Sequence, residues 1–203
     1  ENYPKPALDV LMNHIGTHDT ARILTRLINF ELEHKPREIQ VGYKLTDNEY
    51  AHAKELLKTA TVLQYTLPGF PSIYYGDEAE IDGRITSNEG CRYPMPWDKN
   101  IEETSSWNLY STLAKIKTTS PAFKDGGFKV LWDKDYVFAF ARFTQDELWL
   151  SVCSSDSENR TIELPIDIFG NNFSCVPECD VFAEKLNAKY KDGKMILEVP
   201  AGK

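Results

Sequence analysis

The chain has 203 residues, a net charge of −8 at neutral pH and 41% hydrophobic residues. This length suits one large domain or two modest ones, and the composition is ordinary for a globular protein. The acidic balance, which no lysine- or arginine-rich run offsets, argues against a nucleic-acid partner. No apolar stretch approaches the roughly 20 residues that span a bilayer, so we expect no membrane segment.

The first residues and the cysteines indicate which further kinds of protein the chain does not resemble. The first four residues, Glu-Asn-Tyr-Pro, lack the basic start and apolar run of a signal peptide. The four cysteines, at positions 91, 153, 175 and 179, are too scattered for a disulfide framework and have no histidines at zinc-site spacing. We therefore expect reduced thiols, no metal site and no cofactor. The sequence leaves the compartment open, with a slight preference for the cytoplasm.

Helical and strand patterns alternate along the first 120 residues. In chain order, we expect a buried strand at 10–16, a helix at 20–33, a capped helix at 46–67, a buried strand at 73–75, a long polar loop at 76–103 and a helix at 106–118. The second helix is the clearest, because Thr46 and Glu49 form a capping box before an apolar face. This order is typical of parallel α/β units, but two units fall far short of an eight-stranded barrel of about 250 residues.

After Pro121 the periodicity changes towards two, which indicates strands. In chain order, we expect them at 128–132, 136–143, 148–153, 160–164 and 194–199. Polar residues at 133–135, 145–146 and 192–193 supply hairpin turns. The sequence thus predicts a domain boundary at 121/122, between an α/β part and a small antiparallel sandwich or barrel.

Three motifs carry the chemistry. Residues 16–22 read Gly-Thr-His-Asp-Thr-Ala-Arg, residues 68–78 read Pro-Gly-Phe-Pro-Ser-Ile-Tyr-Tyr-Gly-Asp-Glu, and residues 92–98 read Arg-Tyr-Pro-Met-Pro-Trp-Asp. The first resembles the fourth sequence motif of the alpha-amylase family, and the second resembles that family's eighth barrel strand. The third resembles the substrate-side loop of its neopullulanase, cyclomaltodextrinase and oligo-1,6-glucosidase branch.

The resemblance implies a fold and an activity. Residues 1–121 would be the C-terminal portion of a (β/α)8 barrel, about its seventh and eighth strands with their helices, and residues 122–203 a C-terminal β-sandwich domain. The whole protein would be a retaining hydrolase of alpha-linked glucose oligomers. Such enzymes use a nucleophilic carboxylate and an acid/base carboxyl about 5 Å apart. The family motifs that hold these two groups do not occur here, so we expect the isolated chain to be inactive.

The resemblance also implies site residues. Asp19 matches the family's third carboxylate, which stabilises the transition state, and His18 would hydrogen-bond the same sugar. Arg92 matches an arginine that binds a neighbouring sugar. Asn88 stands where related enzymes have an aspartate, which removes a charge from that contact.

The aromatic residues of the loop leave two readings open. Tyr93 and Trp97 would stack on glucose, or they pack in a core or lid. For Arg22 we expect a role as a prop of the loop rather than a sugar contact. Asp77 and Glu78 are expected to anchor loop backbone, and His14 to be a buried or edge histidine.

Two other functions fit the same residues. The chain is alternatively a non-catalytic glucan-binding or assembly module, or a catalytically inactive relative whose sandwich serves assembly. Its partners would be an alpha-glucan and the missing N-terminal part of the barrel. Because a quarter barrel exposes unpaired strand edges, we expect self-association or swapping of the isolated chain.

Overall fold

The computed structural model describes residues 3–83, 90–170, 173 and 176–202. Contacts divide the chain into an N-terminal unit, residues 1–113, and a C-terminal unit, residues 114–203. Within the described residues, none of the helices is both long and apolar enough to cross a membrane.

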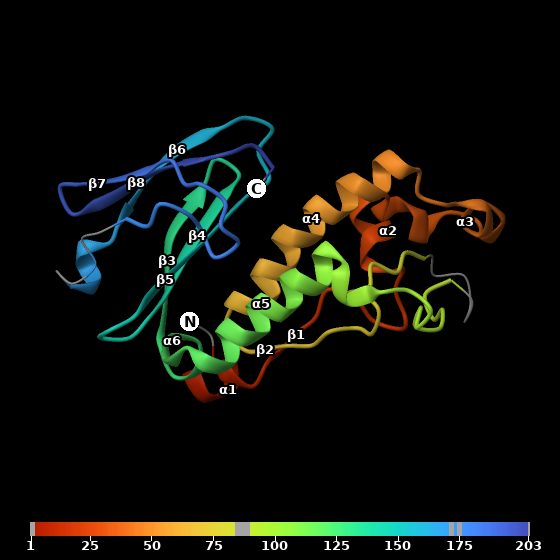
Figure 1. Ribbon diagram of the computed structural model, residues 1–203, viewed down its shortest axis with the longest axis horizontal. Helices are drawn as coiled ribbons and strands as arrows, with labels where there is room; N and C mark the ends of the chain where they lie inside the picture. Colours follow the sequence, from red (N-terminus) through yellow and green to blue (C-terminus); the bar gives the residue numbers. More distant parts are fainter. Residues whose placement is uncertain (1–2, 84–89, 171–172, 174–175, 203) are drawn as a thin grey trace. The chain divides into compact units, whose positions relative to one another are not determined.

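The N-terminal unit consists of helices around one short pair of strands (Figure 1). Its elements are α1 (Lys5–Asp9), β1 (Met12–Asn13), α2 (Ile23–Ile28), the 3-10 helix η1 (Phe30–His34), α3 (Arg37–Gly42), α4 (Asp47–Thr66), β2 (Phe70–Pro71), the 3-10 helix η3 (Ile101–Glu103) and α5 (Ser105–Thr119), which continues into the next unit. The two strands pair in parallel, with Met12 opposite Phe70.

Helix α4 begins as the sequence predicts. The Thr46 hydroxyl accepts from the Glu49 amide at 3.3 Å, and the Glu49 carboxylate accepts from the Thr46 amide at 2.8 Å. The first half of the helix buries Ala53 and Leu57 against α2. The capping box and this part of the predicted apolar face are therefore confirmed.

The second half of α4 departs from the predicted apolar face, because most of the side chains that it buries are polar. Gln64 donates to the carbonyls of Asn13 and Ser72, at 3.0 and 2.9 Å. Asn13 in turn donates to the carbonyl of Pro68 at 2.9 Å. These bonds tie the helix to both strand segments, and the Asn13 carbonyl accepts from Gln64 as well as from the Ser72 amide at 2.8 Å.

The two predicted buried strands are wrong in extent and burial. Strand β1 covers two residues, and Val10, Leu11 and Met12 are 68, 50 and 68% exposed. Residues 73–75 form no strand, because the pairing lies earlier, at β2, and Ile73 is 42% exposed. An apolar run predicts side chains that favour burial. In the described part of the chain, however, the apolar side chains around these two strands remain partly uncovered.

The remaining helical predictions are partly correct. The helix expected at 20–33 is interrupted at Asn29, whose φ of −137° and ψ of 75° separate α2 from η1. The helix expected at 106–118 is confirmed by α5 within one residue at each end. The expected loop at 76–103 contains, among its described residues, only η3 near its end.

The C-terminal unit holds two antiparallel three-stranded sheets. One has the order β3 (Gly127–Lys134), β4 (Val137–Phe143), β5 (Leu148–Ser154), and the other has β6 (Arg160–Pro165), β8 (Lys194–Val199), β7 (Ala188–Lys191). Short helical pieces α6 (Pro121–Lys124) and η4 (Asp167–Phe169) accompany them. One core cluster joins both sheets; its members include Val137, Ala139, Ile162, Leu164 and Leu197.

This unit matches the sequence prediction closely. All five expected strands are present, and among the described residues the prediction missed strand β7, whose Ala-Lys-Tyr-Lys sequence leaves it mostly exposed. The first predicted turn is shifted: Asp135 and Tyr136 form it, with φ of 53° and 57°. The turn at Asp192–Gly193 lies as predicted. The two sheets and their shared core form a β-sandwich.

Candidate functional site

The candidate site lies beyond the carboxyl ends of the two parallel strands. His18 and Asp19 follow β1 after a short link, and the Tyr-Tyr-Gly-Asp-Glu run at 74–78 follows β2. Parallel strands have their carboxyl ends at one edge, which is where barrel and open α/β folds hold their active sites.

Three of the predicted site residues come together there. Arg92 Nη2 lies 3.4 Å from Asp19 Oδ1, and Arg92 Nε donates to the carbonyl of His18 at 3.1 Å. His18 Nε2 lies 3.2 Å from Asp19 Oδ2. Both carboxylate oxygens thus have a neighbour that orients them, although the Asp19 side chain remains 72% exposed. An oriented, accessible carboxylate can accept hydrogen bonds from hydroxyl groups of a ligand.

The backbone around Arg92 is fixed by neighbouring side chains. The buried thiol of Cys91 donates to the carbonyl of His18 at 3.2 Å. The hydroxyl of Tyr74 donates to the carbonyl of Cys91 at 3.2 Å, and the hydroxyl of Tyr75 donates to that of Tyr93 at 2.9 Å. The sequence predicts a buried strand at 73–75 and gives no indication of these bonds, which join segments about 17 residues apart.

Arg22 is buried below this loop, as expected of a prop. Its guanidinium stacks on the rings of Tyr74 and Tyr75, with centroid distances of 4.3 and 4.5 Å, and donates to the Tyr75 carbonyl. Its backbone amide donates to the carbonyl of Gly83 at 2.8 Å. Arg22 is only 1% exposed, so it offers no group to a ligand in solution.

Two acidic residues end the β2 motif and have different surroundings. Asp77 is 1% exposed and lies 3.6 Å from Arg22 Nη1. Burial raises the pKa of Asp77 to about 7, although Arg22 acts in the opposite direction. The Glu78 carboxylate accepts from the Gly76 amide at 2.9 Å and so anchors loop backbone. Gly76 has a φ of 87°, and a Cβ there would collide with Ile81.

The other predicted residues are less closely joined. Tyr93 is 42% exposed and Trp97 is 79% exposed. Asn88 lies outside the described residues. His14 is exposed and directly follows β1. Among the residues that the structure describes, no group of three or more His, Cys, Asp or Glu side chains could hold a metal ion.

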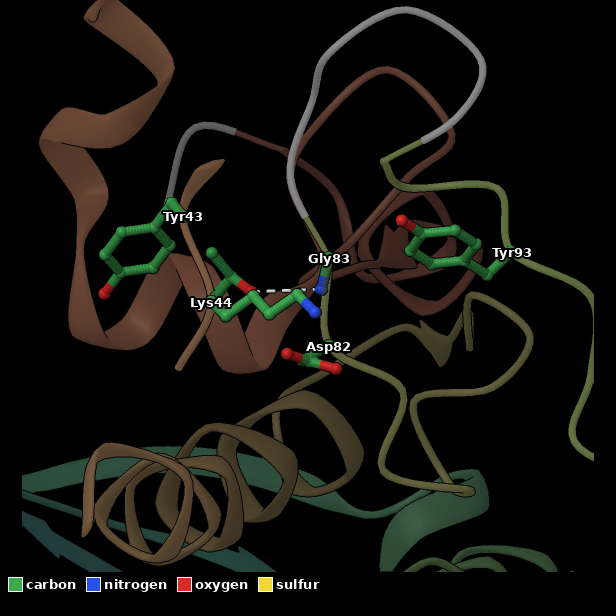
Figure 2. Close-up of a pocket in the computed structure, with 6 residues that line it drawn as sticks. Tyr43, Lys44, Asp82, Gly83 and Tyr93 are labelled. Carbon is green, nitrogen blue, oxygen red and sulfur yellow. Dashed lines mark hydrogen bonds between the residues drawn. The ribbon is translucent and has the colours of Figure 1, made fainter. Parts of the chain in front are cut away.

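A pocket of about 230 Å³ borders Tyr93 (Figure 2). Its lining residues are Thr25, Tyr43, Lys44, Asp82, Gly83 and Tyr93. The Gly83 amide donates to the Thr25 hydroxyl at 3.0 Å, which fixes one wall. Figure 2 shows the side chains of Lys44 and Asp82 between the two tyrosines. Sequence reasoning missed the pocket because separate segments of the chain contribute to it.

Amylopullulanases and cyclomaltodextrinases are among the known proteins that this chain resembles in sequence. It is 33% identical to an amylopullulanase of Thermoanaerobacterium thermosulfurigenes over 148 residues, which cover 70% of this chain and 7% of that protein. It is 29% identical to a cyclomaltodextrinase of a Bacillus species over 162 residues, covering 79% of this chain and 25% of that protein. The chain therefore spans a quarter or less of these relatives' length. No protein-family model matches it.

Solved structures that resemble this chain include an enzyme of the same name as one of the sequence relatives. A cyclomaltodextrinase structure covers 98% of this chain with a TM-score of 0.71 and 25% identity, the match spanning 29% of that protein. A debranching enzyme of Nostoc punctiforme gives the same TM-score at 24% identity, over 98% of this chain and 35% of that protein, and supports the fold alone. Together with the sequence relatives, these matches show that the chain belongs to the alpha-amylase family of glycoside hydrolases and corresponds to its C-terminal region.

Proposed function

We propose that the chain is the C-terminal part of a retaining hydrolase that acts on alpha-linked glucose oligomers. In this proposal residues 1–121 are the last two strand–helix units of a (β/α)8 barrel, and residues 122–203 are the C-terminal β-sandwich domain. The parallel pairing of β1 with β2 supports the barrel assignment. The amylopullulanase and cyclomaltodextrinase relatives support an alpha-glucan as substrate.

The observation that carries the proposal is the orientation of Asp19 by Arg92 and His18 at the carboxyl ends of the strands. Asp19 is the third carboxylate: it accepts hydrogen bonds from ring hydroxyls and favours the flattened, electron-poor sugar of the transition state. His18 donates a hydrogen bond to the same sugar. Arg92 donates to a neighbouring sugar, and the loop residues Asn88, Tyr93 and Trp97 complete the substrate contacts.

The nucleophile and the acid/base carboxyl belong to sequence outside this chain. Without them no glycosyl-enzyme intermediate forms, so the chain alone does not hydrolyse glycosides. The test is an assay of maltodextrin and cyclodextrin hydrolysis by the isolated chain and by the longer protein that contains it. We expect activity only in the longer protein, reduced at least 100-fold by Asp19→Asn, by analogy with the loss of one transition-state contact. Hydrolysis by the isolated chain would contradict this.

The apolar surface on β1 and β2 supports the same view of a larger protein. Its members are Val10, Leu11, Met12, Phe70 and Ile73, all at least 42% exposed. In this proposal the rest of the barrel covers them, and in the isolated chain a second copy does. Light scattering is expected to show concentration-dependent association, which Met12→Lys and Phe70→Lys should weaken. A monomer at all concentrations would count against it.

A second candidate is a non-catalytic glucan-binding or assembly module, which the exposure of Trp97 favours. An indole that is 79% exposed is available to stack on a sugar ring. Calorimetric titration of the isolated chain with maltooligosaccharides separates the two functions. Binding by the chain, together with an inactive longer protein, would favour the module; absence of binding would remove it.

A further inference from the structure

The residues on either side of Arg92 are held by the hydroxyl groups of two adjacent tyrosines. Tyr74 donates to the carbonyl of Cys91 at 3.2 Å, and Tyr75 donates to the carbonyl of Tyr93 at 2.9 Å. Arg92 is the single residue between these two fixed carbonyls. Its backbone therefore has less freedom than the backbone of an ordinary loop residue.

The same Arg92 is the residue that orients the candidate carboxylate. Its guanidinium reaches Asp19 at 3.4 Å and the carbonyl of His18 at 3.1 Å. An exposed ion pair contributes little to stability, because ordering two mobile side chains opposes the attraction. The pair can hold one geometry only if one partner is already fixed, and the tyrosine hydroxyls fix Arg92.

The rings of both tyrosines pack against the buried guanidinium of Arg22. Their rings meet edge to face at a centroid distance of 4.8 Å, and both lie against the guanidinium of Arg22. The carbonyl of Tyr75 accepts from the same guanidinium. The hydroxyl ends of the two packed rings therefore lie where this support meets the 91–93 segment.

We propose that the hydroxyl groups of Tyr74 and Tyr75 are positioning groups for the Arg92–Asp19 pair. They act through Arg92 and touch no substrate. The inference rests on the function proposed above for Asp19, whose contact with the sugar must strengthen as the ring flattens. Such a contact depends on small displacements of the carboxylate, so freeing the loop lowers the rate more than it lowers binding.

The first test uses the isolated chain and the thiol of Cys91, which is 2% exposed. Tyr74→Phe and Tyr75→Phe keep both rings over Arg22 and remove only the hydroxyls. We expect alkylation of Cys91 by iodoacetamide, followed by peptide mass spectrometry, to accelerate about fivefold for each hydroxyl removed, since each bond opposes local opening. An unchanged rate would overturn the proposal.

Two controls accompany this test. Tyr50→Phe removes a hydroxyl that donates to the carbonyl of Glu80 at 2.6 Å, away from the 91–93 segment, and should leave Cys91 unchanged. Cys153, 6% exposed in the C-terminal unit, should react at its wild-type rate in every variant. Acceleration of Cys91 by Tyr50→Phe as well would indicate a general loosening and would count against a specific role.

The second test measures glucan hydrolysis by the longer protein. For the double Phe variant we expect kcat to fall about tenfold with KM within twofold of wild type, the pattern of a lost transition-state contact. Tyr50→Phe should change neither. A raised KM with unchanged kcat would overturn the positioning role. An inactive wild-type protein would instead defeat the proposed function, and Cys91 alkylation would still decide whether the hydroxyls hold the loop.

Discussion

The guanidinium of Arg22 lies 3.6 Å from the carboxylate of Asp77, and both residues are 1% exposed. Two effects oppose each other at this pair. Burial disfavours the ionised carboxyl, and the neighbouring cation favours it. Burial is the larger effect, and it raises the pKa of Asp77 from 3.8 to about 7. A buried ion pair of this kind is therefore a weak source of stability.

The raised pKa predicts the direction of a pH effect. Between about pH 4 and 7 the folded state keeps a proton on Asp77 that the unfolded chain has released. The folded state binds more protons in this window, so its stability falls as the pH rises through it. The loss from this group is on the order of 4 kcal/mol by pH 8.

Asp77→Asn isolates this contribution, because all other carboxyl groups are unchanged. Denaturant unfolding at about pH 3 should give similar free energies for the two proteins, since Asn resembles a carboxyl that is protonated in both the folded and the unfolded state. At pH 8 the variant should be the more stable of the two. If the attraction of Arg22 exceeded the cost of burial, the variant would lose most stability at pH 8, and the assignment would fail.

The capping box of α4 predicts a second, simpler effect. Thr46→Ala removes the hydroxyl that accepts from the Glu49 amide, so one backbone donor at the helix start loses its partner. The free energy of unfolding should fall by about 1 kcal/mol. Asn48→Ala, at an exposed position in the same first turn, serves as the control and should change stability by less than about 0.5 kcal/mol. Equal losses in both variants would refute the cap's contribution.

Local signals in the sequence are sufficient to predict most of the helices and strands. The capping box, the helix at Ser105–Thr119 and five strands of the sandwich depend on neighbouring residues, and the structure contains them. The apolar runs at 10–16 and 73–75 failed because burial depends on what covers a residue, which periodicity does not specify. Strand β7 was missed because its mostly exposed residues leave no alternating apolar pattern.

The candidate site was predictable to a similar degree. The motifs predicted His18, Asp19 and Arg92 as site residues, and the structure brings the three side chains together. They did not indicate the hydroxyl bonds of Tyr74 and Tyr75. Those bonds join residues that are close only after folding, and a tyrosine in an apolar run is ordinarily assigned to the core.

The exposure of Trp97 predicts an effect on binding without an effect on stability. Trp97→Ala removes an indole that is 79% exposed, so little packing is lost. If the indole stacks on a sugar, affinity for maltooligosaccharides should fall by roughly 1 kcal/mol or more, several-fold in Kd. Phe30→Ala, a 53% exposed aromatic side chain in the same unit, is the control for nonspecific effects. Equal affinities for wild type and Trp97→Ala would exclude the indole from the glucan contact.

The hairpin between β3 and β4 gives a prediction for the sandwich alone. Asp135 and Tyr136 have φ of 53° and 57°, the left-handed region that both central residues of a type I′ turn require. Tyr136 is 75% exposed, so its ring contributes little packing to offset the unfavourable conformation. Tyr136→Gly should raise the free energy of unfolding by about 1 kcal/mol. The same change in the extended strand β7, Tyr190→Gly, should lower it, because there glycine only adds freedom to the unfolded chain. Thermal unfolding of both variants measures the difference, and destabilisation by Tyr136→Gly would show that the tyrosine ring contributes more to this turn than its conformation costs.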